Sequence, residues 1–319
     1  MSKTIQEYLD WLDERDDLRW PQPPAPKPLK ATPYLKPLSG IRLVSFSVYG
    51  TLLRIDAGQL FHIHPQPLRM QVALEKTIEE FNMWNSMSRK PGQPWEYMLQ
   101  QYTKLVEEER MVSTPKKGDT PEISSTRLWS KLIDRLIRNE YQYDEGFYGD
   151  VDELSEKVAY FFHASLQGVT AADEALWMLQ TLSSAGLRTG LLADGQVFTL
   201  AQLLRAFRGQ GTIQSLGDLF ASDSITLSHS LRLRKPSPSL FAAAAERFRQ
   251  MGIEPHEVLH VSHRLQDDLS VARQTGFRTA LLAADAVCCQ VSAADVKQAE
   301  VKPDRLLTKL SQVRHLLQI

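Results

Sequence analysis

Apolar residues recur at intervals of three and four along four segments in the first half of the chain. These segments are residues 71–86, 94–111, 123–140 and 151–166. Such spacing gathers apolar side chains on one face of a helix. Short stretches rich in proline and glycine separate the segments, which is typical of turns between helices. The pattern therefore predicts a mainly helical region over residues 56–170.

From residue 171 onward, short apolar runs alternate with amphipathic segments. The runs at 188–192, 258–261 and 279–282 predict strands, and the segments at 197–207, 239–251 and 267–275 predict helices. With an earlier apolar run at 43–46, this order predicts an α/β fold, a doubly wound parallel sheet covered by helices. Ligands bind beyond the carboxyl ends of such strands, so Ser47, Ala193 and His263 should meet in one crevice.

The chain thus divides into three expected parts. Residues 41–55 and 171–319 form the α/β core, and residues 56–170 form a helical cap inserted into it. Residues 1–40 form an arm that starts with a short amphipathic helix and continues as an extended, proline-rich stretch. We expect this arm to wrap its own domain or stay loose, with docking of a protein partner by the arm or the cap as the alternative.

Composition narrows the class of ligand. The 37 Lys and Arg residues nearly balance 38 Asp and Glu residues, so no broad positive field favours nucleic acid or a membrane surface. A small ligand or a protein partner is expected. Cys288 and Cys289 are the chain's two cysteines, and adjacent cysteines rarely reach disulfide geometry. The sequence also lacks a long apolar run and an apolar leader, so we expect a cytoplasmic protein.

The first strand runs directly into a Phe-Ser-Val-Tyr-Gly-Thr motif at residues 46–51. This motif resembles the first motif of the haloacid dehalogenase-like (HAD) hydrolase superfamily. In that family an aspartate at the position of Ser47 attacks the substrate and forms a covalent aspartyl intermediate. Phosphatases of the family place a second aspartate at the position of Tyr49. The resemblance therefore implies an HAD-like core with a cap but without its usual nucleophile.

The other three motifs of the family appear in order, with further departures. Lys235 begins a Lys-Pro-Ser-Pro element and takes the position of the family lysine that pairs with the nucleophile and the phosphate. In the second motif Ala193 replaces a hydroxyl residue. In the fourth motif His263 takes the position of the first aspartate, and Asp268 takes the position of the second. The resemblance implies that Mg²⁺ binding is lost, and no cofactor is expected.

The loop amides after Ala193 remain potential donors to an anion, although Asp194 beside them would repel one. A basic cluster at Arg232, Arg234 and Lys235 is too small for nucleic acid and instead indicates an anion site. The candidate ligand-binding residues are Ser47, Gly50, Thr51, Asp194, Gly195, Lys235, His263 and Asp268.

Three functions remain open at this stage. We favour a pseudoenzyme that has lost aspartyl chemistry and binds a small anion, or has a regulatory role. One alternative is an active hydrolase, a phosphatase or dehalogenase with unusual residues, for example a Ser47, His263 and aspartate arrangement. The other is an interaction protein that works through its arm and cap. His62 and His64 lie in an expected loop, and no third zinc ligand is indicated.

Overall fold

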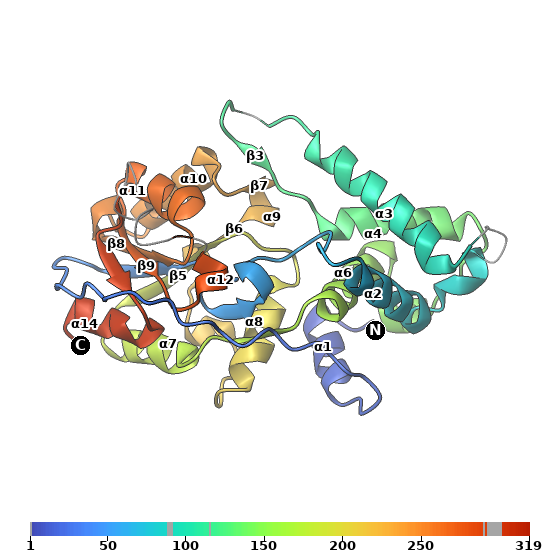
Figure 1. Cartoon of the computed structure of the whole chain (residues 1–319), viewed down its shortest axis with the longest axis horizontal. Helices are drawn as coiled ribbons and strands as arrows, with labels where there is room; N and C mark the ends of the chain where they lie inside the picture. Colours follow the sequence, from blue (N-terminus) through green and yellow to red (C-terminus); the bar gives the residue numbers. More distant parts are fainter. Residues whose placement is uncertain (1, 88–91, 115, 290, 292–301) are drawn as a thin grey trace.

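A computed structural model describes residues 2–87, 92–114, 116–289, 291 and 302–319. Its centre is a six-stranded sheet in the order β10-β9-β8-β1-β5-β6, in which all neighbouring strands are parallel (Figure 1). The strands are β1 (Leu43–Phe46), β5 (Arg188–Ala193), β6 (Ile225–Leu227), β8 (Val258–Ser262), β9 (Arg278–Leu282) and β10 (Arg305–Leu307). This confirms the predicted fold class.

Helices cover both faces of this sheet because successive residues of each strand point to opposite sides. Within β1, Leu43 packs with Phe241 and Phe248 of one apolar cluster, whereas Val44 packs with Leu203 of another. The helices of the core are α7 (Ala175–Ser184), α8 (Thr199–Arg208), α9 (Ser228–Leu231), α10 (Pro238–Gln250), α11 (Val271–Gln274), α12 (Ala286–Cys289) and α14 (Val313–Leu317).

The insert is helical, as the periodicity predicted. Its helices are α2 (Pro67–Glu80), α3 (Pro94–Arg110), α4 (Ser125–Ile137), α5 (Glu145–Tyr148) and α6 (Val151–Leu166). Trp129, Tyr102 and Phe162 are buried at its centre, with ring centroids 5.0–5.6 Å apart. These rings therefore pack the cap, in line with the usual role of aromatic side chains on helices.

Two short antiparallel pairings join the cap to the core. In the first, β2 (Leu53–Ile55) pairs with β4 (Val169–Ala171), where the chain leaves and re-enters the core. In the second, β3 (Thr120–Pro121) of the insert pairs with β7 (Leu233–Arg234) of the core. The second pairing brings the insert directly against the family's lysine motif. No sequence pattern indicates this pairing, because both strands are only two residues long.

The N-terminal arm contacts both the cap and the core. In α1 (Ile5–Asp13), Tyr8, Leu9 and Leu12 are buried in the cap's apolar cluster, whereas Asp10 and Asp13 pair with Arg208 and Arg205 of α8. The proline-rich stretch then runs in an extended conformation along the core (Figure 1).

Some expected boundaries were wrong. The strand β6 was not predicted, and the helix expected at 267–275 begins as a π-helical turn at Leu265–Ser270. Cys288 and Cys289 are free thiols. Within the described ranges, no helix is both long and apolar enough to cross a membrane.

Candidate functional site

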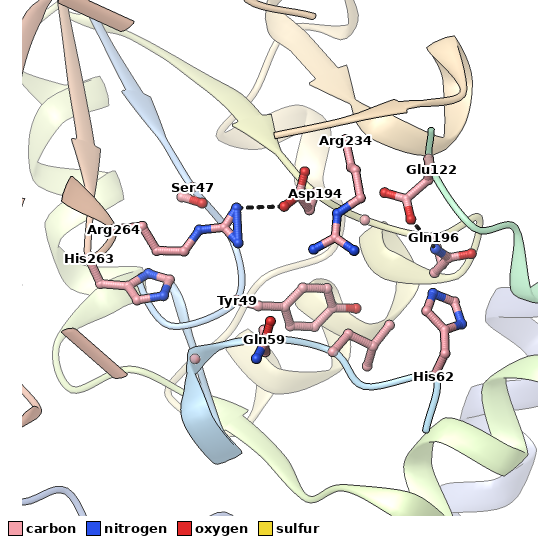
Figure 2. Close-up of a pocket in the computed structure, with 13 residues that line it drawn as sticks. Ser47, Tyr49, Gln59, His62, Glu122, Asp194, Gln196, Arg234, His263 and Arg264 are labelled. Atoms are coloured by element: carbon pink, nitrogen blue, oxygen red, sulfur yellow. Dashed lines mark hydrogen bonds and ion pairs between the residues drawn. The ribbon is translucent and has the colours of Figure 1, made fainter. Parts of the chain in front are cut away.

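The predicted crevice lies at the carboxyl ends of β1, β5 and β8. A cavity of about 50 Å³ opens there, and Figure 2 shows the side chains that line it. Among the candidate residues, those on the cavity wall are Ser47, Tyr49, Asp194, Gly195 and His263. One ordered water needs about 10–15 Å³ of such volume, so the cavity holds a few waters or one small anion.

Ser47 follows β1, and its backbone amide donates to the carbonyl of Val261 at 3.0 Å. The turn that follows needs glycine at residue 50, where φ is +77° and an added Cβ would lie 2.5 Å from the His263 ring. The Ser47 hydroxyl accepts a hydrogen bond from Lys235 Nζ at 3.3 Å. The nucleophile position is therefore held by a neutral side chain next to an ammonium group.

Lys235 is sealed below the cavity. Its Nζ also donates to Asp268 Oδ2 at 2.5 Å and to the Leu192 carbonyl at 2.7 Å. The side chains of Lys235 and Asp268 are both 0% exposed, and neither residue lines the cavity. This corrects our expectation that Lys235 is free to hold an anion. A substitution of Lys235 consequently tests folding more than ligand binding.

His260, which we had not singled out, completes this buried network. Its Nε2 lies 2.9 Å from Asp268 Oδ1, and its Nδ1 lies 3.2 Å from the hydroxyl of Ser45. Because a carboxylate only accepts, we assign the proton of the ring to Nε2 and let Ser45 donate to Nδ1. His260 and Ser45 lie inside apolar strands, so no sequence signal marked them.

In this network, each charged side chain shifts the pKa of its partner. Burial would raise the pKa of Asp268, but the charge of Lys235 and the contact with His260 outweigh it and hold that pKa below its usual range. Burial lowers the pKa of Lys235, and Asp268 opposes this effect. The pair is therefore an ammonium and a carboxylate. An ammonium that donates to Ser47 cannot take the proton of its hydroxyl.

His263 does not activate Ser47 either. Its Nδ1 lies 3.3 Å from the Thr51 hydroxyl, whereas its Nε2 is buried and has no partner among the described residues. Burial, with a contribution from Arg264, lowers the pKa of His263 to about 3, so the ring is neutral. Within the described part of the chain, Ser47 and His263 share no hydrogen bond. The Ser47, His263 and aspartate arrangement that the alternative of an active hydrolase invoked is therefore not formed.

The negative charge of the Asp194 carboxylate is compensated by two neighbouring donors. Its Oδ1 accepts from the backbone amide of Lys235 at 2.8 Å, and its Oδ2 accepts from Arg264 Nη2 at 2.7 Å. The repulsion of an anion that Asp194 alone would cause is thus offset by Arg264. Arg264 follows His263 in the chain, but its position gave no family signal.

Two of the loop amides after Ala193 are already used within the protein. Gly195 N donates to the Ser228 hydroxyl at 2.9 Å, and Gln196 N donates to the Thr199 hydroxyl at 2.7 Å. Ala193 is the buried last residue of β5. These amides therefore do not supply the anion contacts we expected from them.

Three further candidates, Tyr49, Gly50 and Thr51, do not present a free polar group to this cavity in the described structure. Tyr49 lines the cavity, but its hydroxyl donates to Gln202 Oε1 at 2.8 Å. Burial raises the pKa of Tyr49, so it stays neutral. Gly50 and Thr51 instead line a separate cavity of about 500 Å³ next to Pro26 and Pro28 of the arm.

Arg234 is the side chain best placed to bind a ligand. It lines the cavity, and Figure 2 shows its guanidinium directed into it. No hydrogen bond or ion pair of this guanidinium occurs within the described ranges. The sequence had indicated an anion site at the basic cluster that contains Arg234. In that cluster Arg232 is exposed and Lys235 is sealed, which leaves Arg234 to face the cavity.

The cap contributes His62 and Glu122 to the cavity wall. Burial, with the charges of Arg234 and Arg110, lowers the pKa of His62 to about 3. Burial, with the charge of Asp194, raises the pKa of Glu122 to about 7. We missed Glu122 because the pairing of β3 with β7 places it. His62 lies in a loop, as predicted, and lines this cavity.

These residues do not fit Mg²⁺, which prefers an octahedron of oxygen ligands. Both carboxylate oxygens of Asp268 are engaged by Lys235 and His260. Ser47 and His263 replace the family's other carboxylates. No group of three or more His, Cys, Asp or Glu side chains is arranged for a metal in the described part of the chain.

Comparison with known proteins agrees with this fold. The family model described as haloacid dehalogenase-like hydrolase matches residues 46–276. A 2-haloacid dehalogenase from Pseudomonas syringae pv. Tomato DC3000 is similar in structure, with TM-score 0.50, 19% identity, and coverage of 86% of this chain and 97% of that chain. For L-2-haloacid dehalogenase from Xanthobacter autotrophicus the TM-score is 0.43 and the identity is 21%. The match covers 86% of this chain and 98% of that chain.

A predicted phosphoglycolate phosphatase from Haemophilus somnus 129pt gives TM-score 0.47 at 15% identity, with 86% and 97% coverage. Comparison with curated proteins gave no significant match. Likeness at these identities concerns the fold and not the reaction. The family match spans most of the chain and includes all four motif positions. The chain therefore belongs to the haloacid dehalogenase-like hydrolase family.

Proposed function

We propose that this protein binds a small anion in the crevice through Arg234 and has lost the aspartyl chemistry of its family. One observation carries the proposal. The nucleophile position holds Ser47, whose hydroxyl accepts from a sealed ammonium, while the Arg234 guanidinium, which has no hydrogen bond or ion pair among the described residues, lines the same cavity. The residues that would do chemistry are committed to the fold, and the residue that would bind an anion faces the cavity.

Covalent chemistry at Ser47 needs a base that removes the hydroxyl proton. Lys235 is protonated and paired, and Asp268 accepts from two buried donors. His263 directs its Nδ1 to Thr51. None of these groups is both free and in contact with the Ser47 oxygen. This arrangement supports binding without turnover.

The size and polarity of the cavity support a carboxylate or phosphate of a few atoms. A guanidinium presents planar, bidentate donors that match both groups. Arg264, although paired with Asp194, adds a second positive charge on the same wall. A ligand much larger than acetate or phosphate would have to displace the cap residues His62 and Glu122.

Thermal unfolding with and without acetate or inorganic phosphate tests this proposal. A ligand that binds the folded state raises the melting temperature by mass action. We expect a shift for the parent and for Arg232→Met, an exposed arginine two positions away, and a much smaller shift for Arg234→Met. Equal shifts in all three proteins would place the anion elsewhere.

Two activity measurements test the loss of catalysis. We expect no hydrolysis of p-nitrophenyl phosphate that depends on Mg²⁺, because the carboxylate ligands are absent or engaged. We also expect no adduct at Ser47 after treatment with a fluorophosphonate. A Ser47 adduct that disappears in His263→Ala would instead support the alternative of an active hydrolase with unusual residues.

A further inference from the structure

Glu122 and Arg234 are brought together by the pairing of the cap with the core. Thr120 pairs with Arg234 across β3 and β7, and the amide of Glu122 then donates to the Arg232 carbonyl at 3.0 Å. Glu122 therefore directly follows β3, the strand that pairs with the Arg234-containing strand β7. Both side chains line the cavity, one from each domain (Figure 2).

The groups around the Glu122 carboxyl come from several elements. The hydroxyl of Ser228 donates to Oε2, the amide of Ile123 donates to Oε1 at 3.0 Å, and Gln196 Nε2 lies 3.4 Å from Oε1. The charged groups that act on it are Arg234, which favours the carboxylate, and Asp194, which opposes it. Arg264 also interacts with Glu122 but forms its ion pair with Asp194.

We propose that Glu122 takes up a proton from solvent when the cavity binds an anion, so that binding is coupled to pH. This inference rests on the proposed function and specifies how that site is regulated. A bound anion would engage the guanidinium of Arg234 and place a second negative charge beside Glu122. Both effects disfavour the carboxylate form. A protonated Glu122 can donate its hydrogen to the bound anion, which the carboxylate cannot do.

The raised pKa of Glu122 in the free protein allows this coupling to operate near neutral pH. Burial and Asp194 already raise its pKa to about 7 without a ligand. A bound anion raises it further. At pH 7.5 the free protein therefore carries mostly the carboxylate, and the complex carries more of the acid. Anion affinity consequently falls as pH rises from 6.5 to 8.5, because the proton must be taken up from a more dilute source.

Titration calorimetry with acetate tests this coupling, because acetate itself does not titrate in this range. Measured at pH 7.5 in two buffers of different ionisation enthalpy, the heat reports the protons taken up on binding. We expect up to one proton per acetate in the parent. Glu107→Gln, the same change at an exposed site on α3, should behave like the parent.

Glu122→Gln mimics the protonated acid. We expect no proton uptake for this variant and an affinity that does not change between pH 6.5 and 8.5. Acetate binding by the parent without proton uptake would overturn the coupling and leave the proposed function standing. If Glu122→Gln still takes up a proton when acetate binds, another group is the proton acceptor, and the proposed role of Glu122 is overturned. Failure of the parent to bind acetate or phosphate at all would overturn the proposed function, and this inference with it.

Discussion

Two neighbouring regions of this protein contain the same kinds of charged side chain and use them differently. Beneath the crevice, Lys235, Asp268 and His260 are sealed from solvent and satisfy one another. Above it, Arg234 lines a cavity without an ion pair in the described ranges, close to Glu122. The difference teaches that a family motif can survive as part of the fold, and we propose that ligand contacts have moved to residues beside it.

The substitution at the nucleophile position explains the sealed region. In the family the lysine pairs with the nucleophile, but Ser47 offers it only a neutral oxygen at 3.3 Å. Asp268 is therefore the carboxylate on which Lys235 depends. A buried charge without a partner is costly, so each residue of the pair stabilises the fold by compensating the charge of the other.

The largest expected effect follows from breaking this pair. Lys235→Met leaves Asp268 as an unpaired buried charge and should reduce the free energy of unfolding by about 3–5 kcal/mol. Urea denaturation followed by circular dichroism measures this loss. Combining Lys235→Met with Asp268→Leu removes both charges and should recover part of it. A single variant as stable as the parent would contradict the structural role of the pair.

The buried histidines and Glu122 should change stability with pH in opposite directions. Burial lowers the pKa of His163, His260 and His263. The unfolded chain therefore binds more protons below about pH 6.5, and stability is lost as pH falls, by up to about 1.4 kcal/mol per pH unit for each histidine. Glu122 acts in the opposite direction, because its raised pKa stabilises the fold as pH falls from about 7 towards 4.5.

The free energy of unfolding, measured between pH 7 and 5.5, tests both the loss of stability from the histidines and the opposite effect of Glu122. His263→Gln should make the slope shallower by about one bound proton, whereas Glu122→Gln should make it steeper. His256→Gln, the same change at an exposed position, serves as the matched control. A shallower slope in Glu122→Gln would show that its carboxyl is not the titrating group in the cavity.

The fold and part of the site were predictable from sequence. Parallel strands end at one edge, which is why Ser47 and His263 line one cavity, although Asp194 lines it in place of the expected Ala193. The contact of Lys235 with Asp268 also followed from the motifs. The burial of Lys235, which leaves it unavailable to an anion, did not follow, because burial depends on packing that no motif records. Glu122 reached the cavity through a two-residue strand pairing, which is too short to leave a periodic signal.

The smallest expected effect on stability belongs to the cavity. Arg234→Met removes a charge that has no ion pair in the described ranges, so the free energy of unfolding should change by about 0.5 kcal/mol or less. The same urea titration measures it beside Lys235→Met. A loss of several kcal/mol would show that Arg234 belongs to the structural network and that the two regions do not differ as we describe.

A crystal structure of the protein with phosphate or acetate tests the central claim most directly. We predict that the anion lies in the cavity, with its oxygens within hydrogen-bond distance of the Arg234 guanidinium and with Lys235 still paired to Asp268. An anion bound instead to Lys235 and the Ser47 hydroxyl, with the pair to Asp268 opened, would contradict the account.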